Sequence, residues 1–192
     1  MPQTHGPDAE NRLDLERICA LMPTCPPNAP EPGAAMPNEN QSIPRHRPVL
    51  EGEFAGWSYW PGDYFEVHSG PFYFRPDSDG RIRCAFRVTR QHLNGGGTTH
   101  GGCLLTFADY SIFAIAEQDL AGARGVTVSL NSEFLGPALE GDLVEATGEV
   151  VKAGASLLFI RGVVTANGRP ALSFSGVIKK IKPRPGDSRP AV

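Results

Sequence analysis

The stretch that decides the fold is HGGCLLTFADYSIFAIAEQDL, residues 100–120. From residue 102 onward its apolar side chains recur at helical spacing, and they cover nearly every side of the expected helix. A helix that is apolar on all sides is usually surrounded by protein. Gly122 and Gly125 mark the end of the pattern. We therefore expect a long buried helix over residues 102–120.

Segments typical of β-strands lie on both sides of this helix. Before it come residues 72–75 and 82–88, and the second run alternates apolar and polar side chains. After it come four more segments: residues 126–134, 143–151, 157–165 and 171–181. Asn167-Gly168, between the last two, predicts a tight hairpin. One helix of about five turns cannot cover both faces of a sheet this large. We expect an α+β fold with a curved antiparallel sheet around the helix.

Composition excludes several classes of protein. The formal net charge of -3 provides no basic field, so nucleic acid is not an expected partner. No run of about 18 apolar residues occurs, so no membrane span is expected. The four cysteines lack paired spacing, and the first 22 residues lack the basic and apolar regions of a secretory signal. A reduced, cytoplasmic protein with free thiols is expected.

The chain divides by composition into three parts. Residues 1–50 hold ten of the eighteen prolines and predict an extension, with one short helix over residues 13–21. Aromatic residues crowd between positions 54 and 65, which predicts a packed lid or a short helix. The main domain is expected over residues 51–184, followed by a tail over residues 185–192.

The loop before the long helix is suited to an anion. HLNGGGTTHGG, residues 92–102, contains five glycines, which let backbone and ligand approach closely. The triplet at residues 100–102 lies where the helix begins, so unpaired N–H groups and the positive end of the helix dipole point into the loop. Such a site also suits the oxyanion formed when a carbonyl is attacked.

Asp109 follows about two turns into the helix, among apolar neighbours. A carboxylate there is costly unless it is paired, hydrogen-bonded or functional, and active sites concentrate such groups. The alternative from the pattern alone is an aspartate bonded to nearby backbone or facing a wet subunit interface. Both interpretations stay open at this point.

Other chemistries fit the same residues less well. The glycines lack the spacing of a dinucleotide fingerprint, and no Gly-Lys-Ser/Thr phosphate loop is present. His92 and His100 have no partners at metal-ligand spacing, so no metal site is expected. Cys103 has no clear histidine partner beyond His100 for nucleophilic catalysis. Ser111 lies in no G-x-S-x-G elbow.

Asn94, the triplet His100-Gly101-Gly102 and Asp109 together resemble the signature of PaaI-type hot-dog acyl-CoA thioesterases. Residues 125–131 and 134–138 resemble the third strand of that family and its following turn. The resemblance covers roughly residues 70–182. It implies the hot-dog fold, with a sheet of five or six strands wrapped around the central helix.

The resemblance also implies a role for each matching residue. Asp109 acts as general base or nucleophile against the thioester carbon, and the backbone N–H of Gly101 polarises its carbonyl. Asn94 positions the water or the thioester, and His100 shapes the same turn. A hydroxyl at Thr127 orients the water, although relatives often have serine at this position.

Coenzyme A carries phosphates and needs cations near the mouth of the pocket. The expected substrate-binding residues are Gly102, Arg90, Arg124 and Arg161. No cofactor is expected, since coenzyme A enters as part of the substrate. The resemblance implies a homodimer or homotetramer, with Gly101 from one subunit and Asp109 from the other forming each site.

The expected reaction is hydrolysis of an acyl-CoA to a carboxylic acid and coenzyme A, which makes the protein a thioester hydrolase. The alternative is a hot-dog module that binds or senses acyl-CoA without hydrolysing it. A hot-dog dehydratase fits poorly, because the sequence contains no histidine after residue 102.

Overall fold

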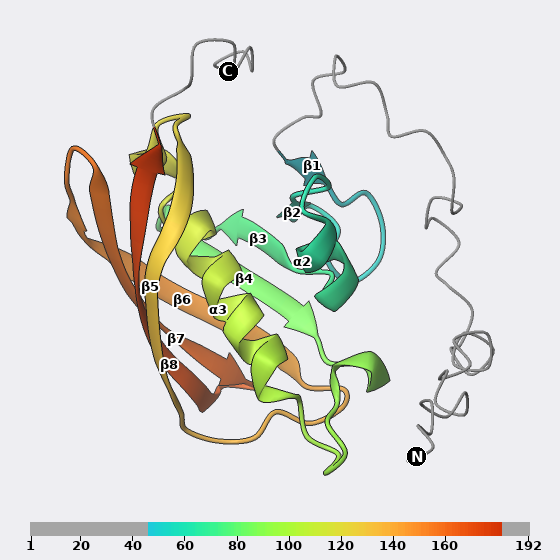
Figure 1. Cartoon of the computed structure of the whole chain (residues 1–192). Helices are drawn as coiled ribbons and strands as arrows, with labels where there is room; N and C mark the ends of the chain where they lie inside the picture. The colour runs from blue at the N-terminus through green and yellow to red at the C-terminus, as the bar shows by residue number, and fades with distance from the viewer. Residues whose placement is uncertain (1–45, 182–192) are drawn as a thin grey trace, which may run out of the picture. The chain divides into compact units, whose positions relative to one another are not determined.

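Helix α3 (Gly101–Ile115) lies across the concave side of a curved antiparallel sheet (Figure 1). The computed structural model describes residues 46–181, which fall within a unit spanning Ser42–Val192. The helix contacts β4, β5, β6, β7 and β8. The strands are β1 (Arg47–Pro48), β2 (Ser58–Tyr59), β3 (Tyr73–Pro76), β4 (Ile82–Arg87), β5 (Arg124–Phe134), β6 (Leu143–Ala153), β7 (Leu157–Ala166) and β8 (Arg169–Ile181).

The predicted α+β architecture with a buried central helix is confirmed. The strand order is β1-β2-β3-β4-β6-β7-β8-β5, with antiparallel neighbours throughout. Six longer strands agree with the predicted number, and the two-residue strands β1 and β2 extend the sheet beyond them. Because β1 begins at Arg47, the sheet starts before the predicted domain boundary at residue 51. The predicted helix at residues 13–21 and the tail lie outside the described residues.

The predicted long helix is interrupted near its end. α3 stops at Ile115, and a short helix, α4 (Glu117–Leu120), follows Ala116. Ala116 has φ -91° and ψ 5°, a conformation that does not continue an α-helix. Ala121 then adopts a left-handed conformation and ends α4.

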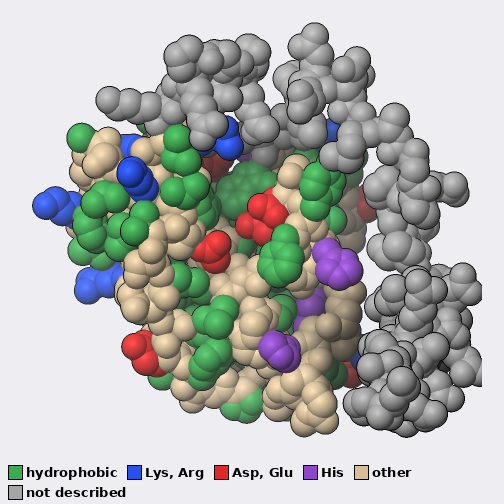
Figure 2. Space-filling model, in the orientation of Figure 1, with side chains coloured by type: hydrophobic (Ala, Val, Ile, Leu, Met, Phe, Trp, Pro, Cys, Tyr) green, Lys and Arg blue, Asp and Glu red, His purple; other side chains and the backbone are tan. Residues whose placement is uncertain are grey.

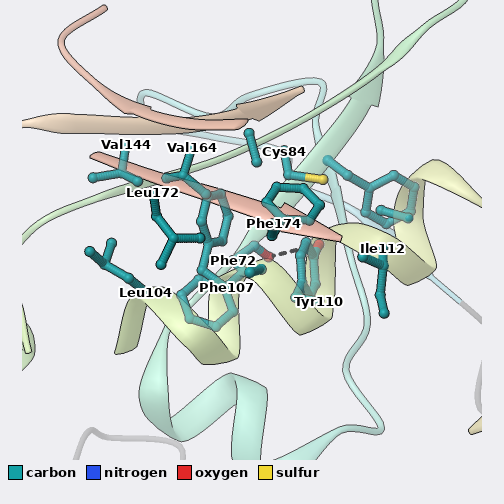
Figure 3. Packing of buried hydrophobic residues seen from close by; sticks show 14 of the residues in the cluster. Phe72, Cys84, Leu104, Phe107, Tyr110, Ile112, Val144, Val164, Leu172 and Phe174 are labelled. Carbon is teal, nitrogen blue, oxygen red and sulfur yellow. Dashed lines mark hydrogen bonds between the residues drawn. The ribbon is translucent and has the colours of Figure 1, made fainter. Parts of the chain in front are cut away.

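The core is formed by the inner faces of the sheet and α3. Phe72, Phe107 and Tyr110 pack together there, with ring centroids of Phe72 at 5.2 Å from Phe107 and 5.5 Å from Tyr110 (Figure 3). The Tyr110 hydroxyl donates a hydrogen bond to the Phe72 carbonyl at 3.2 Å. Burying a tyrosine with its hydroxyl satisfied avoids the cost of an unpaired polar group.

A second small cluster covers the outer face of β4. Phe54 and Trp57 pack there with Ala85, which is fully buried. The crowded aromatic segment therefore contributes packing to the sheet as well as a short helix, α2 (Tyr64–Ser69). None of the helices within residues 46–181 is long and apolar enough to cross a membrane.

One local prediction depends on turn chemistry. Asn167 and Gly168 both have positive φ, 48° and 76°, as a two-residue type I′ hairpin requires. This turn joins β7 to β8, with Ala166 paired to Arg169. The predicted hairpin is therefore confirmed.

Candidate active site

The N-terminus of α3 is shaped by the residue that precedes it. His100 is the N-cap, and its Nδ1 accepts a hydrogen bond from the backbone N–H of Gly102 at 2.9 Å. Gly101 is the first residue of the helix. Its N–H has no acceptor within the helix, because the first N–H groups of a helix lack carbonyl partners one turn earlier. This N–H is therefore available to an oxygen of a ligand.

Asn94 organises the glycine loop from within. Its Oδ1 accepts a hydrogen bond from the N–H of Gly96 at 2.8 Å, and its Nδ2 donates to the Thr98 hydroxyl at 2.9 Å. Gly97 supplies the positive φ, 80°, that the loop requires. The side chain thus holds the loop that leads into α3. In this structure the described contacts of Asn94 stay within the loop and do not extend to Asp109.

Asp109 lies on α3 and is half-buried. Thr127, on β5, donates a hydrogen bond from its hydroxyl to Asp109 Oδ1 at 2.7 Å. Burial raises the pKa of the Asp109 carboxyl, the Thr127 hydrogen bond lowers it, and the negative charge of Asp63 raises it further. The carboxylate is therefore held by one hydroxyl in a partly desolvated position.

A cavity of about 370 Å³ opens beside Asp109, between α2 and α3. Acidic side chains lie among hydrophobic ones on the face of the molecule drawn in Figure 2. Asp63 is the N-cap of α2 and accepts a hydrogen bond from the backbone of Glu66. The described residues that line the cavity are Asp63, Phe65, Glu66, Leu105, Thr106 and Asp109. Reasoning from sequence missed Asp63 and Glu66, although an Asp followed three residues later by Glu signals a helix start.

Gly101 and Asp109 are not brought together within one chain. They are eight residues apart on a continuous helix, which separates them by about 12 Å along its axis. His100 and Gly102 stay with Gly101 at the helix N-terminus, whereas Thr127 lies with Asp109. The predicted catalytic residues thus form two groups in a single subunit.

The predicted cations do not form one cluster with these groups. Arg90 belongs to the 3-10 turn η1 (Arg90–His92), Arg124 begins β5, and Arg161 lies within β7. All three are exposed. Arg161 is paired with Glu149 on the neighbouring strand at 2.6 Å. A phosphate would therefore compete with a carboxylate for Arg161.

Neither of the alternative nucleophiles is activated. Burial raises the pKa of the Cys103 thiol to about 11, so it is protonated at neutral pH. Ser111 is fully buried, and its hydroxyl donates to the Phe107 carbonyl at 2.7 Å. His92 is also buried, and its Nδ1 accepts a hydrogen bond from the backbone of Thr89. Residues 46–181 contain no group of three or more potential metal ligands.

Comparisons with known proteins identify the family. The sequence profile of the thioesterase superfamily matches residues 96–171. A protein of Pseudomonas aeruginosa named "Putative esterase PA0474" is 37% identical over 109 residues, which cover 56% of this chain and 81% of that protein. The chain belongs to the thioesterase superfamily. The predicted class of enzyme, a thioester hydrolase, is thereby confirmed.

More distant relatives agree with this assignment. Human acyl-coenzyme A thioesterase 13 is 36% identical over 81 residues, which cover 42% of this chain and 57% of the human protein. The solved structure of the Escherichia coli PaaI protein from the phenylacetic acid degradation operon superposes with a TM-score of 0.56 at 24% identity. That superposition covers 63% of this chain and 86% of the PaaI chain. The predicted hot-dog fold and PaaI-type resemblance are confirmed.

Proposed function

We propose that this thioesterase hydrolyses acyl-CoA thioesters to a free carboxylic acid and coenzyme A, with Asp109 as the catalytic carboxylate. The observation that carries the proposal is the half-buried Asp109, which accepts a hydrogen bond from Thr127 beside a cavity of about 370 Å³. A cavity of this size can hold an acyl group. The name of the human relative agrees with acyl-CoA as the substrate.

Asp109 has two possible roles in the reaction. As general base it takes a proton from water while the water oxygen attacks the thioester carbon, and the C–S bond then breaks to release the thiolate, which takes up that proton. As nucleophile its carboxylate attacks the carbon and expels the thiolate, leaving an anhydride that water hydrolyses. In both cases the ionised carboxylate is the active form.

The carbonyl oxygen needs a donor as negative charge develops on it. The N–H of Gly101 at the start of α3 suits this role, and the helix dipole favours the charge. Both groups must lie within a few ångströms of one thioester, yet about 12 Å of helix separates them in one chain. We therefore propose that each site combines Gly101 of one subunit with Asp109 of another.

The exposed edge of the sheet supports a homodimer. β5 pairs only with β8 among the described strands. Val126 and Val128 on β5 are 44% and 58% exposed, which is unusual for valines on a strand. A second copy that pairs along this edge would cover both valines and satisfy the free backbone groups. A homotetramer formed from two such dimers remains our proposal for the larger assembly.

We assign the phosphates of coenzyme A to exposed arginines outside the cavity. Arg90 and Arg124 remain the proposed partners. At Arg161 a phosphate would compete with the Glu149 carboxylate. His100, Gly102 and the loop held by Asn94 would place the thioester against the helix N-terminus.

The test is thiol release from a panel of aryl and aliphatic acyl-CoAs by the wild type and Asp109→Asn. Loss of the ionisable carboxylate should lower kcat on the order of 10²–10⁴, as loss of a general base does. Cys103→Ser is the matched control and should keep its activity within about twofold, since its thiol is protonated. An equal collapse in that control would contradict the assignment of Asp109. Tight binding without turnover by the wild type would instead identify the sensing module.

A further inference from the structure

Glu66 is a second carboxyl group on the wall of the cavity that Asp109 lines. It comes from α2, which packs against α3. Its Oε2 is buried and has no hydrogen-bond partner among the described residues. Leaving a buried polar atom without a partner is costly, so such an atom in a ligand cavity indicates a missing partner. The mechanism proposed for Asp109 does not use this group.

The surroundings of Glu66 oppose a negative charge on it. Burial raises the pKa of Glu66 to about 8, and the carboxylates of Asp63 and Asp109 add to the effect. The described residues that line the cavity include no lysine, arginine or histidine. The carboxyl group is therefore protonated at neutral pH and carries an O–H donor. Rotation about the last side-chain bond exchanges its two oxygens, so the proton can be presented to the cavity.

We propose that Glu66 determines the acyl specificity of the enzyme: its carboxyl group donates a hydrogen bond to an uncharged oxygen on the acyl group. The inference rests on the proposed function, in which the acyl group occupies this cavity. Ketone, hydroxyl and phenol oxygens are suitable acceptors. A carboxylate on the acyl group would instead face three acidic side chains and be disfavoured.

Glu66 also lines a second, smaller recess whose walls are largely aromatic. A narrow recess continues from Glu66 toward the core, and it is lined by Trp60, Phe72 and Tyr110 together with Tyr59, Val67 and Pro71. The Tyr110 hydroxyl is already bonded to the Phe72 carbonyl. Glu66 lines both the cavity and this recess, so its carboxyl group lies where the two meet.

The experiment compares three thioesters of equal chain length: hexanoyl-CoA, 5-oxohexanoyl-CoA and adipyl-CoA. The wild type should show kcat/KM for the oxo substrate about five- to tenfold above that for hexanoyl-CoA, the range expected for one hydrogen bond. Adipyl-CoA should be the poorest of the three. Matched pairs of four and eight carbons are measured in parallel, so that the position of the oxygen is also varied.

Two variants separate a hydrogen bond from a steric effect. Glu66→Gln keeps an N–H donor and should keep the preference for the oxo substrate. Glu66→Met has a similar size but no donor, so the ratio of kcat/KM for the oxo substrate to that for hexanoyl-CoA should fall close to one. Glu140→Gln, an exposed glutamate outside the cavity, is the control and should match the wild type.

The pH dependence of this ratio provides a second readout. Above pH 8 the ionised Glu66 can only accept hydrogen bonds, so the wild-type preference should fall, while that of Glu66→Gln should stay constant. The titratable groups near Glu66 are Asp63, Asp109, Tyr110, Cys84 and Tyr59. Each of them is unchanged in both variants.

Each outcome decides between the two proposals. The role of Glu66 is wrong if the wild type hydrolyses the thioesters with equal kcat/KM for the oxo and unsubstituted members of every pair. It is also wrong if Glu66→Met keeps the wild-type ratio of these two kcat/KM values. In both cases the proposed function stands. If only aryl acyl-CoAs of the earlier panel are hydrolysed, the role of Glu66 is wrong and the proposed function stands; if no acyl-CoA is hydrolysed at all, both proposals are wrong.

Discussion

At the scale of single residues, Asp109 illustrates how opposing effects adjust one carboxyl group. Burial and the charge of Asp63 favour its neutral form, and the hydrogen bond from Thr127 favours its ionised form. The Thr127 hydroxyl therefore keeps the carboxylate available in a partly desolvated site. The role of Thr127 follows from this contact, which links positions 18 residues apart in the chain.

Replacement of Thr127 by valine tests that role. The variant keeps the shape of the side chain but loses the donor, so the pKa of Asp109 should rise. Because the ionised carboxylate is the active form, the acid limb of the pH–rate profile should move to higher pH. On the acid limb of the profile we expect kcat/KM to fall about tenfold or more, as for the loss of a hydrogen bond to a charged group. Thr127→Ser should retain the wild-type profile, and an unshifted profile in Thr127→Val would refute the role.

At the scale of elements, two neighbouring residues at the start of α3 have different roles. His100 caps the helix with its side chain, and Gly101 presents a backbone N–H. His100 has φ -60° and ψ 133°, a conformation that also suits the residue before a proline. Proline is well tolerated at the first helical position, where the N–H has no partner in the helix.

Gly101→Pro should therefore remove the N–H while α3 is retained. If this N–H polarises the thioester carbonyl, kcat should fall by about 10²–10³, as for loss of one oxyanion donor. Gly101→Ala is the matched control, since its added Cβ meets the same Phe134 ring, at 3.0 Å, but the N–H remains. Circular dichroism reports whether both variants stay folded. Equal activity of the two variants would exclude the N–H as the donor.

Helix α3 also shows how much of the fold could be predicted from the sequence. Its apolar pattern predicted a buried helix, and α3 is buried along most of its length, including Phe107 and Ile112. The break at Ala116 could not be predicted, because alanine is a good helix former and the local sequence favours continuation.

At the scale of the whole molecule, the separation of Gly101 from Asp109 is the decisive feature. Within one chain the two groups cannot contact the same thioester, since about 12 Å of helix lies between them. Two copies related by a twofold axis would form two equivalent sites, each with one group from either subunit. The proposed dimer would bring the two groups to one thioester.

Mixing two inactive variants tests this arrangement. Asp109→Asn and Gly101→Pro subunits, co-expressed in equal amounts, should form mixed dimers that contain one intact site. Activity should recover to about a quarter of the wild-type value, because half of the dimers are mixed and one of their two sites is intact. Each variant alone is the control. If a complete site lies within one subunit, the mixture will stay inactive.

The sequence by itself determined the order of the six longer strands and the central helix, the antiparallel sheet around that helix and the hairpin at Asn167-Gly168. These features depend on the period of apolar residues and on turn chemistry, which are local properties. It also identified Asp109 and the start of the helix as the candidate site.

Only the tertiary structure decided which distant residues meet. It brings Thr127 to Asp109, places Glu66 from α2 in the same cavity, and buries Ala85 under Phe54 from the aromatic segment. Such contacts depend on how elements pack, and local periodicity does not encode packing between segments far apart in the chain. The pKa of a carboxyl group depends on burial and neighbouring charges, so the protonated state of Glu66 also follows only from the folded chain.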